Sequence, residues 1–232
     1  MTRNHKKVSS GSKVLDELLN GGYEEGIITT IYGASGTGKS NISILSAINQ
    51  ARQGKKVIYI DSEGSFSTER AKQIFTDYEK IIDNIIFLKP TSFQEQIKAI
   101  DEVKDIINVE NRIGLIIIDS IALLYRLELG EKKDASKTNR EMARQLRNLA
   151  EIARKKELPI LVINQVYADF KDKENIHMVG GDLLKYWSKC IIKLESIEGI
   201  KKATIIKHRS IPYGKSAYFE IKNKGLEKVE QV

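Results

Sequence analysis

Short apolar runs alternate with segments of helical periodicity between residues 27 and 164. The apolar runs predict five strands: Ile27–Tyr32, Lys56–Ile60, Ile85–Leu88, Gly114–Asp119 and Pro159–Asn164. The periodic segments between them predict four helices: Lys39–Arg52, Thr68–Lys80, Phe93–Val109 and Asn139–Lys156. The last two runs are apolar without alternation, as expected for strands buried on both faces. This order predicts an α/β fold with a mostly parallel sheet flanked by helices.

The pattern changes after residue 180. Three short apolar runs, Cys190–Glu195, Lys202–Lys207 and Ser216–Ile221, are separated by turn residues and predict an antiparallel extension of the sheet. Two stretches, Arg126–Lys137 and Tyr167–Val179, lack a clear period and are left unassigned. Each follows a buried strand at its carboxyl end, where open α/β sheets bind their ligands.

The length of 232 residues fits one compact domain, and we expect residues 1–232 to form it, with 1–10 as a short tail. Cys190 is the only cysteine, which excludes a disulfide-stapled secreted fold. No uncharged apolar run approaches the roughly 18–20 residues of a membrane span. The N-terminus also lacks the apolar core of a signal peptide. We therefore expect a cytoplasmic protein that has no membrane partner.

The positive charge is concentrated near the end of the chain. The net charge is +7, and residues 185–232 hold eleven Lys and Arg against five Glu. One interpretation is that lysines solvate the edges of strands and prevent aggregation. The other is that the segment forms a surface for a polyanion. Composition alone leaves both interpretations open.

A phosphate-binding motif stands between the first strand and the first helix. It reads Gly33, Ala34, Ser35, Gly36, Thr37, Gly38, Lys39, Ser40, and it matches G-x-x-x-x-G-K-[ST] in full. The glycines let successive backbone N–H groups turn inward around an anion, and the new helix adds its N-terminal dipole. Lys39 supplies a positive charge for the phosphates, and Ser40 supplies a hydroxyl for Mg²⁺. We include Asn41, the next residue, in the nucleotide-binding set.

Two acidic residues at strand ends complete the predicted site. Asp119 closes a buried strand and is the candidate Mg²⁺ ligand, directly or through water, although an Asp there can also cap a helix. Glu63 lies just past the strand Lys56–Ile60 and is the best-placed carboxylate for activating water. The alternative is that Glu63 or Asp61 only braces the turn.

Four further segments, taken in order, resemble the RecA superfamily, in particular its archaeal and eukaryotic recombinase branch. They are GSKVLDELLNGG at 11–22, DSEGSF at 61–66, Asn164-Gln165-Val166, and Gly180-Gly181-Asp182. The resemblance covers about residues 10–228. The short N-terminus and the ending Lys207–Lys215 are similar to a short archaeal paralogue of that branch, which has no separate N-terminal lobe.

The resemblance implies roles for individual residues. Glu63 becomes the catalytic base, and Gln165 the group that links the γ-phosphate to the stretch 167–179, with a plain strand-end amide as the alternative. Arg70 becomes a candidate to stack on adenine, unless it is a solvated helix residue. Lys207 and Arg209 occupy the place where related ATPases reach a neighbour's nucleotide, with edge-strand solvation as the alternative. Together with Lys215, they are the candidate trans or DNA contacts.

The resemblance also implies a function. We expect an ATP- and Mg²⁺-binding, DNA-binding accessory protein of recombination and repair, which aids the main archaeal recombinase and hydrolyses ATP weakly. Its partners would be DNA, in single-stranded form, the recombinase or other recombination proteins, and a second copy in a homo-oligomer. The alternatives are an active DNA-stimulated ATPase with strand exchange, and a clock-type signalling ATPase without DNA. Tyr125, Tyr167 and Phe170 are candidates for base stacking or for the core.

Overall fold

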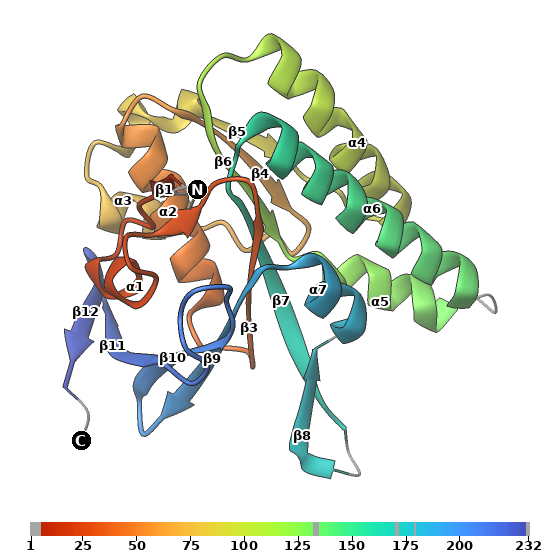
Figure 1. Ribbon diagram of the computed structural model, residues 1–232. Helices are drawn as coiled ribbons and strands as arrows, with labels where there is room; N and C mark the ends of the chain where they lie inside the picture. Colours follow the sequence, from red (N-terminus) through yellow and green to blue (C-terminus); the bar gives the residue numbers. More distant parts are fainter. Residues whose placement is uncertain (1–5, 132–134, 170–171, 179, 231–232) are drawn as a thin grey trace.

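The computed structural model describes residues 6–131, 135–169, 172–178 and 180–230, and a long central sheet runs through it (Figure 1). Five strands form its parallel part: β5 (Ile85–Leu88), β4 (Lys56–Asp61), β6 (Ile113–Asp119), β7 (Ile160–Asp169) and β3 (Ile28–Gly33). On the other side of β3 the sheet continues through four strands: β9 (Cys190–Ile197), β10 (Ile200–Lys207), β11 (Ser216–Lys222) and β12 (Gly225–Val229). β9 is parallel to β3, and the last three strands are antiparallel to their neighbours. The predicted fold class is therefore confirmed.

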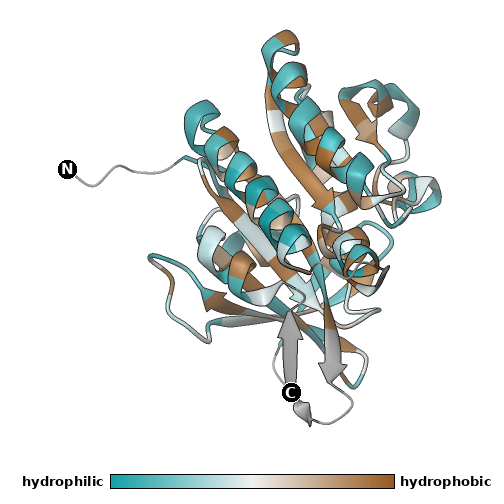
Figure 2. Cartoon of the chain, turned by 90° about the vertical axis from the view of Figure 1, so that its right-hand side faces the viewer, coloured by the Kyte–Doolittle hydropathy of each residue, from teal (hydrophilic) through white to brown (hydrophobic). Residues whose placement is uncertain are grey.

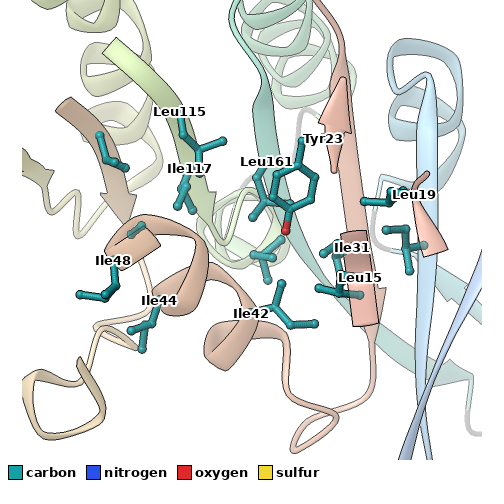
Figure 3. Close-up of a cluster of buried hydrophobic side chains, with 14 of the residues drawn as sticks. Leu15, Leu19, Tyr23, Ile31, Ile42, Ile44, Ile48, Leu115, Ile117 and Leu161 are labelled. Carbon is teal, nitrogen blue, oxygen red and sulfur yellow. The ribbon is translucent and has the colours of Figure 1, made fainter. Parts of the chain in front are cut away.

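Helices cover both faces of the sheet. One face packs against α1 (Lys13–Leu18), α2 (Lys39–Arg52) and α3 (Thr68–Ile74); the other packs against α4 (Phe93–Val109), α5 (Ala122–Glu131), α6 (Ala135–Lys156) and α7 (Gly181–Trp187). Figure 3 shows the first layer, in which Ile31, Ile117 and Leu161 of the sheet lie beside Ile42 and Ile48 of α2. Figure 2 shows hydrophobic strands behind helices whose outer faces are hydrophilic. No helix among the described residues is long and apolar enough to cross a membrane.

The structure corrects one predicted helix and adds small elements. The helix predicted over Thr68–Lys80 ends at Ile74, and two 3₁₀ turns follow, η1 (Tyr78–Lys80) and η2 (Ile82–Asn84). β1 (Lys7–Val8) pairs with β2 (Tyr23–Glu24), so residues 7 and 8 are part of the fold. The strands β1 and β2, the helix α1 and the strand β12 have too few residues to show a period, and the sequence did not predict them.

The two unassigned stretches are mostly regular structure. Residues 126–131 belong to α5, and residues 135–137 open α6. Residues 167–169 extend β7, which pairs antiparallel with β8 (Asp172–Met178). Tyr125 is buried in the core, so it is not an exposed stacking ring. Phe170 lies outside the described residues, as does the side chain of Tyr167.

Candidate nucleotide site

The phosphate motif forms the loop between β3 and α2, as the sequence predicts. Gly38 is the N-cap of α2, has φ 100°, and offers no side chain to the first N–H groups of the helix. Those groups are therefore left for an anion. At Gly33, a Cβ atom would lie 2.4 Å from the Leu194 carbonyl oxygen, so only glycine lets the loop start this close to β9. Ser40 and Asn41 follow in the first turn of α2 and are half-buried.

Lys39 is buried under this loop. Its side chain is 7% exposed, and its Nζ donates a hydrogen bond of 2.8 Å to the Ala34 carbonyl oxygen. Burial lowers the pKa of Lys39, while the negative charges of Glu63 and Asp119 act in the opposite direction. Both carboxylates therefore lie within electrostatic reach of the ammonium group, and the three charged groups form one site.

Asp119 lies at the end of β6 and is fully buried. Its Oδ2 accepts hydrogen bonds of 3.0 Å from the hydroxyls of Ser43, Tyr59 and Ser65. Its Oδ1 is buried and has no hydrogen-bond partner among the described residues. Burial raises the pKa of Asp119. A buried carboxylate oxygen without a donor suits a cation, so the residues fit Mg²⁺ at this position.

Glu63 is held on both oxygens. Its Oε2 accepts a hydrogen bond of 2.7 Å from Gln165 Nε2, and its Oε1 accepts one from the buried hydroxyl of Ser120. Gln165 is level with Gly33 in the pairing of β7 with β3, which brings the amide to the phosphate loop. The structure thus joins Glu63 and Gln165, which are 102 residues apart.

The residue that braces the turn after β4 is Asp61. Its carboxylate oxygens accept hydrogen bonds from the backbone N–H groups of Ser65, at 3.0 Å, and Phe66, at 3.2 Å. Ser67 caps α3 through a hydrogen bond from the Arg70 N–H group. Glu63 makes neither of these structural contacts and points to Ser120 and Gln165 instead.

Arg70 is held beside the phosphate loop by its contacts with the turn between β11 and β12. Its guanidinium donates hydrogen bonds of 2.7 Å to the Lys222 carbonyl oxygen and 3.1 Å to that of Asn223. The preceding residue, Ile221, sits against the phosphate loop, because a Cβ on Gly38 would be 2.8 Å from its Cδ1. Arg70 therefore connects α3 to the β11–β12 turn at the side of the site, and its contact with adenine stays a prediction.

The candidate trans or DNA contacts lie elsewhere. The Nζ atom of Lys207 donates to the Lys185 carbonyl oxygen, and burial lowers the pKa of Lys207. Arg209 forms an ion pair with Glu24, with Nη2 and Oε2 2.6 Å apart, and Glu24 is only 5% exposed. Neither Lys207 nor Arg209 contacts the phosphate loop of its own chain, so a trans or DNA role stays a prediction.

Lys215 is tied to the end of α1. Its Nζ donates to the carbonyl oxygens of Leu18, at 3.0 Å, and Glu17, at 3.1 Å, and to Asn20 Oδ1 at 2.9 Å. Lysine at a helix C-terminus satisfies carbonyl groups that have no partner within the helix. Its DNA role stays a prediction as well.

The sequence did not single out several residues that complete these sites. Ser43, Tyr59, Ser65 and Ser120 support the carboxylates, and Glu24 holds Arg209. Ser120 has the clearest signal, because it directly follows Asp119 at the end of a buried strand. The others become visible only when the strands and helices are placed together.

The comparisons with known proteins agree with this geometry. A family model described as Rad51 matches residues 2–229. A protein of Methanococcus maripaludis named "DNA repair and recombination protein RadB" is 48% identical over 217 residues, covering 92% of this chain and 97% of the relative. A protein of the same name from Methanobrevibacter smithii is 42% identical over 229 residues, or 96% of each chain. A solved structure described as "Crystal structure of the RadB recombinase" has a TM-score of 0.79 and 34% identity, covering 96% of this chain and 99% of the other.

Proposed function

The chain belongs to the Rad51 family, and on that premise we propose that it is an ATP- and DNA-binding accessory protein of recombination and repair. In this role it acts as a mediator of the main archaeal recombinase and hydrolyses ATP slowly. The names of the similar proteins place them in DNA repair and recombination. The site described above supports the nucleotide part of the proposal.

The observation that carries the proposal is the group formed by Lys39, Asp119 and Glu63 under the phosphate loop. The N–H groups of the loop and Lys39 would hold the phosphates, and Ser40 and the free Oδ1 of Asp119 would hold Mg²⁺. When bound, Mg²⁺ supplies positive charge that offsets the charge on the phosphate oxygens. Arg70 and Asn41 flank this site and complete the proposed nucleotide contacts.

Slow hydrolysis is supported by the contacts of Glu63. As the base, Glu63 must accept a proton from water on one carboxylate oxygen. Each oxygen already accepts one hydrogen bond, from Ser120 or Gln165, so an attacking water must compete with these donors for the carboxylate, which slows proton transfer to Glu63. Gln165 directly precedes Val166, where the pairing of β7 with β8 begins, so its contact with Glu63 would couple the nucleotide site to the β7–β8 hairpin.

The strongest alternative is an active DNA-stimulated ATPase that exchanges strands. It is favoured by the contact of Gln165 with Glu63, because Glu63, Asp119 and Gln165 then meet at one site. A clock-type signalling ATPase without DNA would use the same nucleotide site and would not bind DNA. The three functions therefore differ in DNA binding and in the effect of DNA on turnover.

One set of assays tests the proposal. Binding of a single-stranded oligonucleotide is measured against salt concentration, and ATP hydrolysis is measured in the same samples. We expect binding that weakens as salt rises, and slow hydrolysis that changes little with DNA. Absence of salt-sensitive binding overturns the DNA part of the proposal. Turnover stimulated many-fold by DNA, together with strand exchange, favours the active recombinase.

The mediator role has its own test. A purified archaeal recombinase is assembled on single-stranded DNA with and without this protein, and the rate of assembly is measured. We expect faster assembly with the wild-type chain and ATP. An unchanged rate over a wide range of protein concentrations contradicts the mediator role.

A further inference from the structure

A pocket of about 700 Å³ lies at the edge of the sheet opposite the phosphate loop. Its lining comes from the start of β3, the second half of α6, the end of α7 and the end of β10 with the two residues that follow. Figure 1 shows where these elements lie in the fold. Its volume is within the roughly 300–1,000 Å³ of typical ligand sites. The length of β3 puts it about 16 Å from Gly33. The nucleotide site described above does not use it.

Two aromatic side chains stand at this pocket. Tyr186 is 70% exposed, and Trp187 is partly buried against the core under α6. Their ring centroids are 5.2 Å apart, with the planes at 85°, so Trp187 braces Tyr186 edge-to-face. A large ring that is braced and still open to solvent is a suitable platform for stacking a nucleobase.

The pocket also has more positive than negative side chains among the described residues that line it. Arg147 and Arg154 are seven residues apart on α6, so they lie on one face about 10 Å apart. Lys189, which directly precedes β9, lines the same pocket. Among the described residues, Arg154 and Lys189 form no side-chain hydrogen bond or ion pair. The one carboxylate in the lining, Glu151, is 2.6 Å from Lys155.

The other two cations of the lining are already engaged. Lys207 donates to a backbone carbonyl oxygen, and Arg209 is paired with Glu24. Moving Arg209 to a ligand would leave the nearly buried Glu24 carboxylate with only the ring of His208, 3.7 Å away, which is costly. Among the described residues, the lining cations that no hydrogen bond or ion pair holds are therefore Arg147 and Arg154 of α6 and Lys189.

We propose that this pocket binds single-stranded DNA, an inference that rests on the DNA-binding function proposed above. Tyr186 stacks on a base, and Arg147, Arg154 and Lys189 contact the backbone phosphates. Stacking accepts any base, and phosphate contacts carry no sequence information, so the binding has little sequence preference. DNA and nucleotide then occupy opposite edges of the sheet, and neither excludes the other.

Binding at this pocket can be followed by the fluorescence of Trp187, because it is the only tryptophan in the chain. An oligo(dT) carrying a fluorescent label is titrated at low salt, and its anisotropy and the Trp187 emission are recorded together. We expect the emission to change with the same midpoint as the anisotropy. Tyr186→Ala weakens binding about tenfold, and Tyr186→Phe keeps most of it, since the ring remains.

The charge contacts have a matched control on the same helix. Arg154→Ala and Lys189→Ala each weaken DNA binding several-fold. Each also reduces, by about 0.7, the steepness with which the logarithm of the binding constant falls with the logarithm of the salt concentration. Arg140→Ala removes the same charge from an exposed position of α6 outside the pocket and leaves affinity close to wild type. Circular dichroism and thermal melts of each variant check that the fold is retained.

The outcomes separate this inference from the proposed function. DNA binding seen by anisotropy, with no change in Trp187 emission and wild-type affinity in Tyr186→Ala, overturns the pocket as the DNA site and leaves the function standing. No binding by anisotropy overturns both. A third outcome is that ATP or inorganic phosphate changes the Trp187 emission to saturation, while oligo(dT) does not change it. That result assigns the pocket to a nucleotide, such as one bound by a second copy of the chain, and also overturns the inference.

Discussion

The two edges of the central sheet use lysine and arginine in different ways. At the carboxyl edge, Lys39 lies under the phosphate loop, and Asp119 has a buried carboxylate oxygen without a donor among the described residues. At the amino edge, Arg209 and Lys215 are bound to groups of their own chain. The first edge leaves polar groups available to the proposed nucleotide, whereas these two cations at the second edge hold elements together. A basic segment therefore indicates function only after its internal partners are known.

The largest expected effect is at the carboxyl edge. Lys39→Ala removes the charge that faces the phosphates, and we expect the affinity for ATP to fall about 100-fold or more. The measurement is a titration with a fluorescent ATP analogue or calorimetry. Lys80→Ala is the matched control, because Lys80 is exposed and pairs with Asp77 on the surface. Equal affinity in Lys39→Ala and wild type would mean that this edge does not bind nucleotide.

The next effect is on stability at the amino edge. Arg209→Ala leaves the Glu24 carboxylate, which is 5% exposed, with only the buried ring of His208, whose Nε2 lies 3.7 Å from Oε1. Arg209 itself is 38% exposed. We expect a loss of about 1–3 kcal/mol in the free energy of unfolding, below the full effect of a buried pair because one partner is partly solvated. Urea unfolding measures it. The double variant Glu24→Gln/Arg209→Ala should recover part of the loss.

The same variant separates the two roles considered for Arg209. If Arg209 acts mainly on a neighbour's nucleotide, Arg209→Ala lowers ATP hydrolysis while stability stays at the wild-type value. That result would mean that Arg209, like Lys39, serves a nucleotide, and that the amino edge does not use this cation only to hold its own elements together. A loss of stability with normal turnover per folded molecule supports the structural role.

The smallest expected effect is at Lys215. Lys215→Ala frees the carbonyl groups of Leu18 and Glu17 at the end of α1, which water can partly satisfy. We expect a loss of about 1 kcal/mol, or about 3 °C in Tm for a chain of this length. Lys201→Ala, which removes a lysine that contacts only Ser196 in the described structure, should change Tm less. Weaker DNA binding in Lys215→Ala with an unchanged Tm would instead favour a DNA contact.

The sequence predicts the carboxyl edge well because its signals are local. The phosphate motif sits in eight consecutive residues, and the ends of buried parallel strands meet at one edge, which brings Asp119 and Glu63 to it. Arg209 shows the opposite case, since its partner Glu24 is 185 residues away. No local pattern indicates that pair. The same holds for the Tyr59 and Ser65 hydroxyls that support Asp119.

The sequence pattern did not predict the structure of the two unassigned stretches for another physical reason. In α5 the buried residues Leu124 and Tyr125 are followed by a mixture of charged and apolar residues, so no period of 3.6 residues is visible. The helix is stabilised by packing against α4 and α6, not by an amphipathic pattern of its own. β8 has no alternation of apolar residues either, and it forms as the second strand of a hairpin with β7.

The central claim is that Glu63 acts as the base in a nucleotide site formed by the carboxyl edge. The most direct measurement is single-turnover hydrolysis of bound ATP by wild type and Glu63→Gln, with the affinity for ATP measured on the same preparations. We predict unchanged affinity and a loss of hydrolysis of about 100-fold or more, because glutamine cannot accept the proton of water. Hydrolysis at the wild-type rate in Glu63→Gln would contradict the account and remove Glu63 from the mechanism.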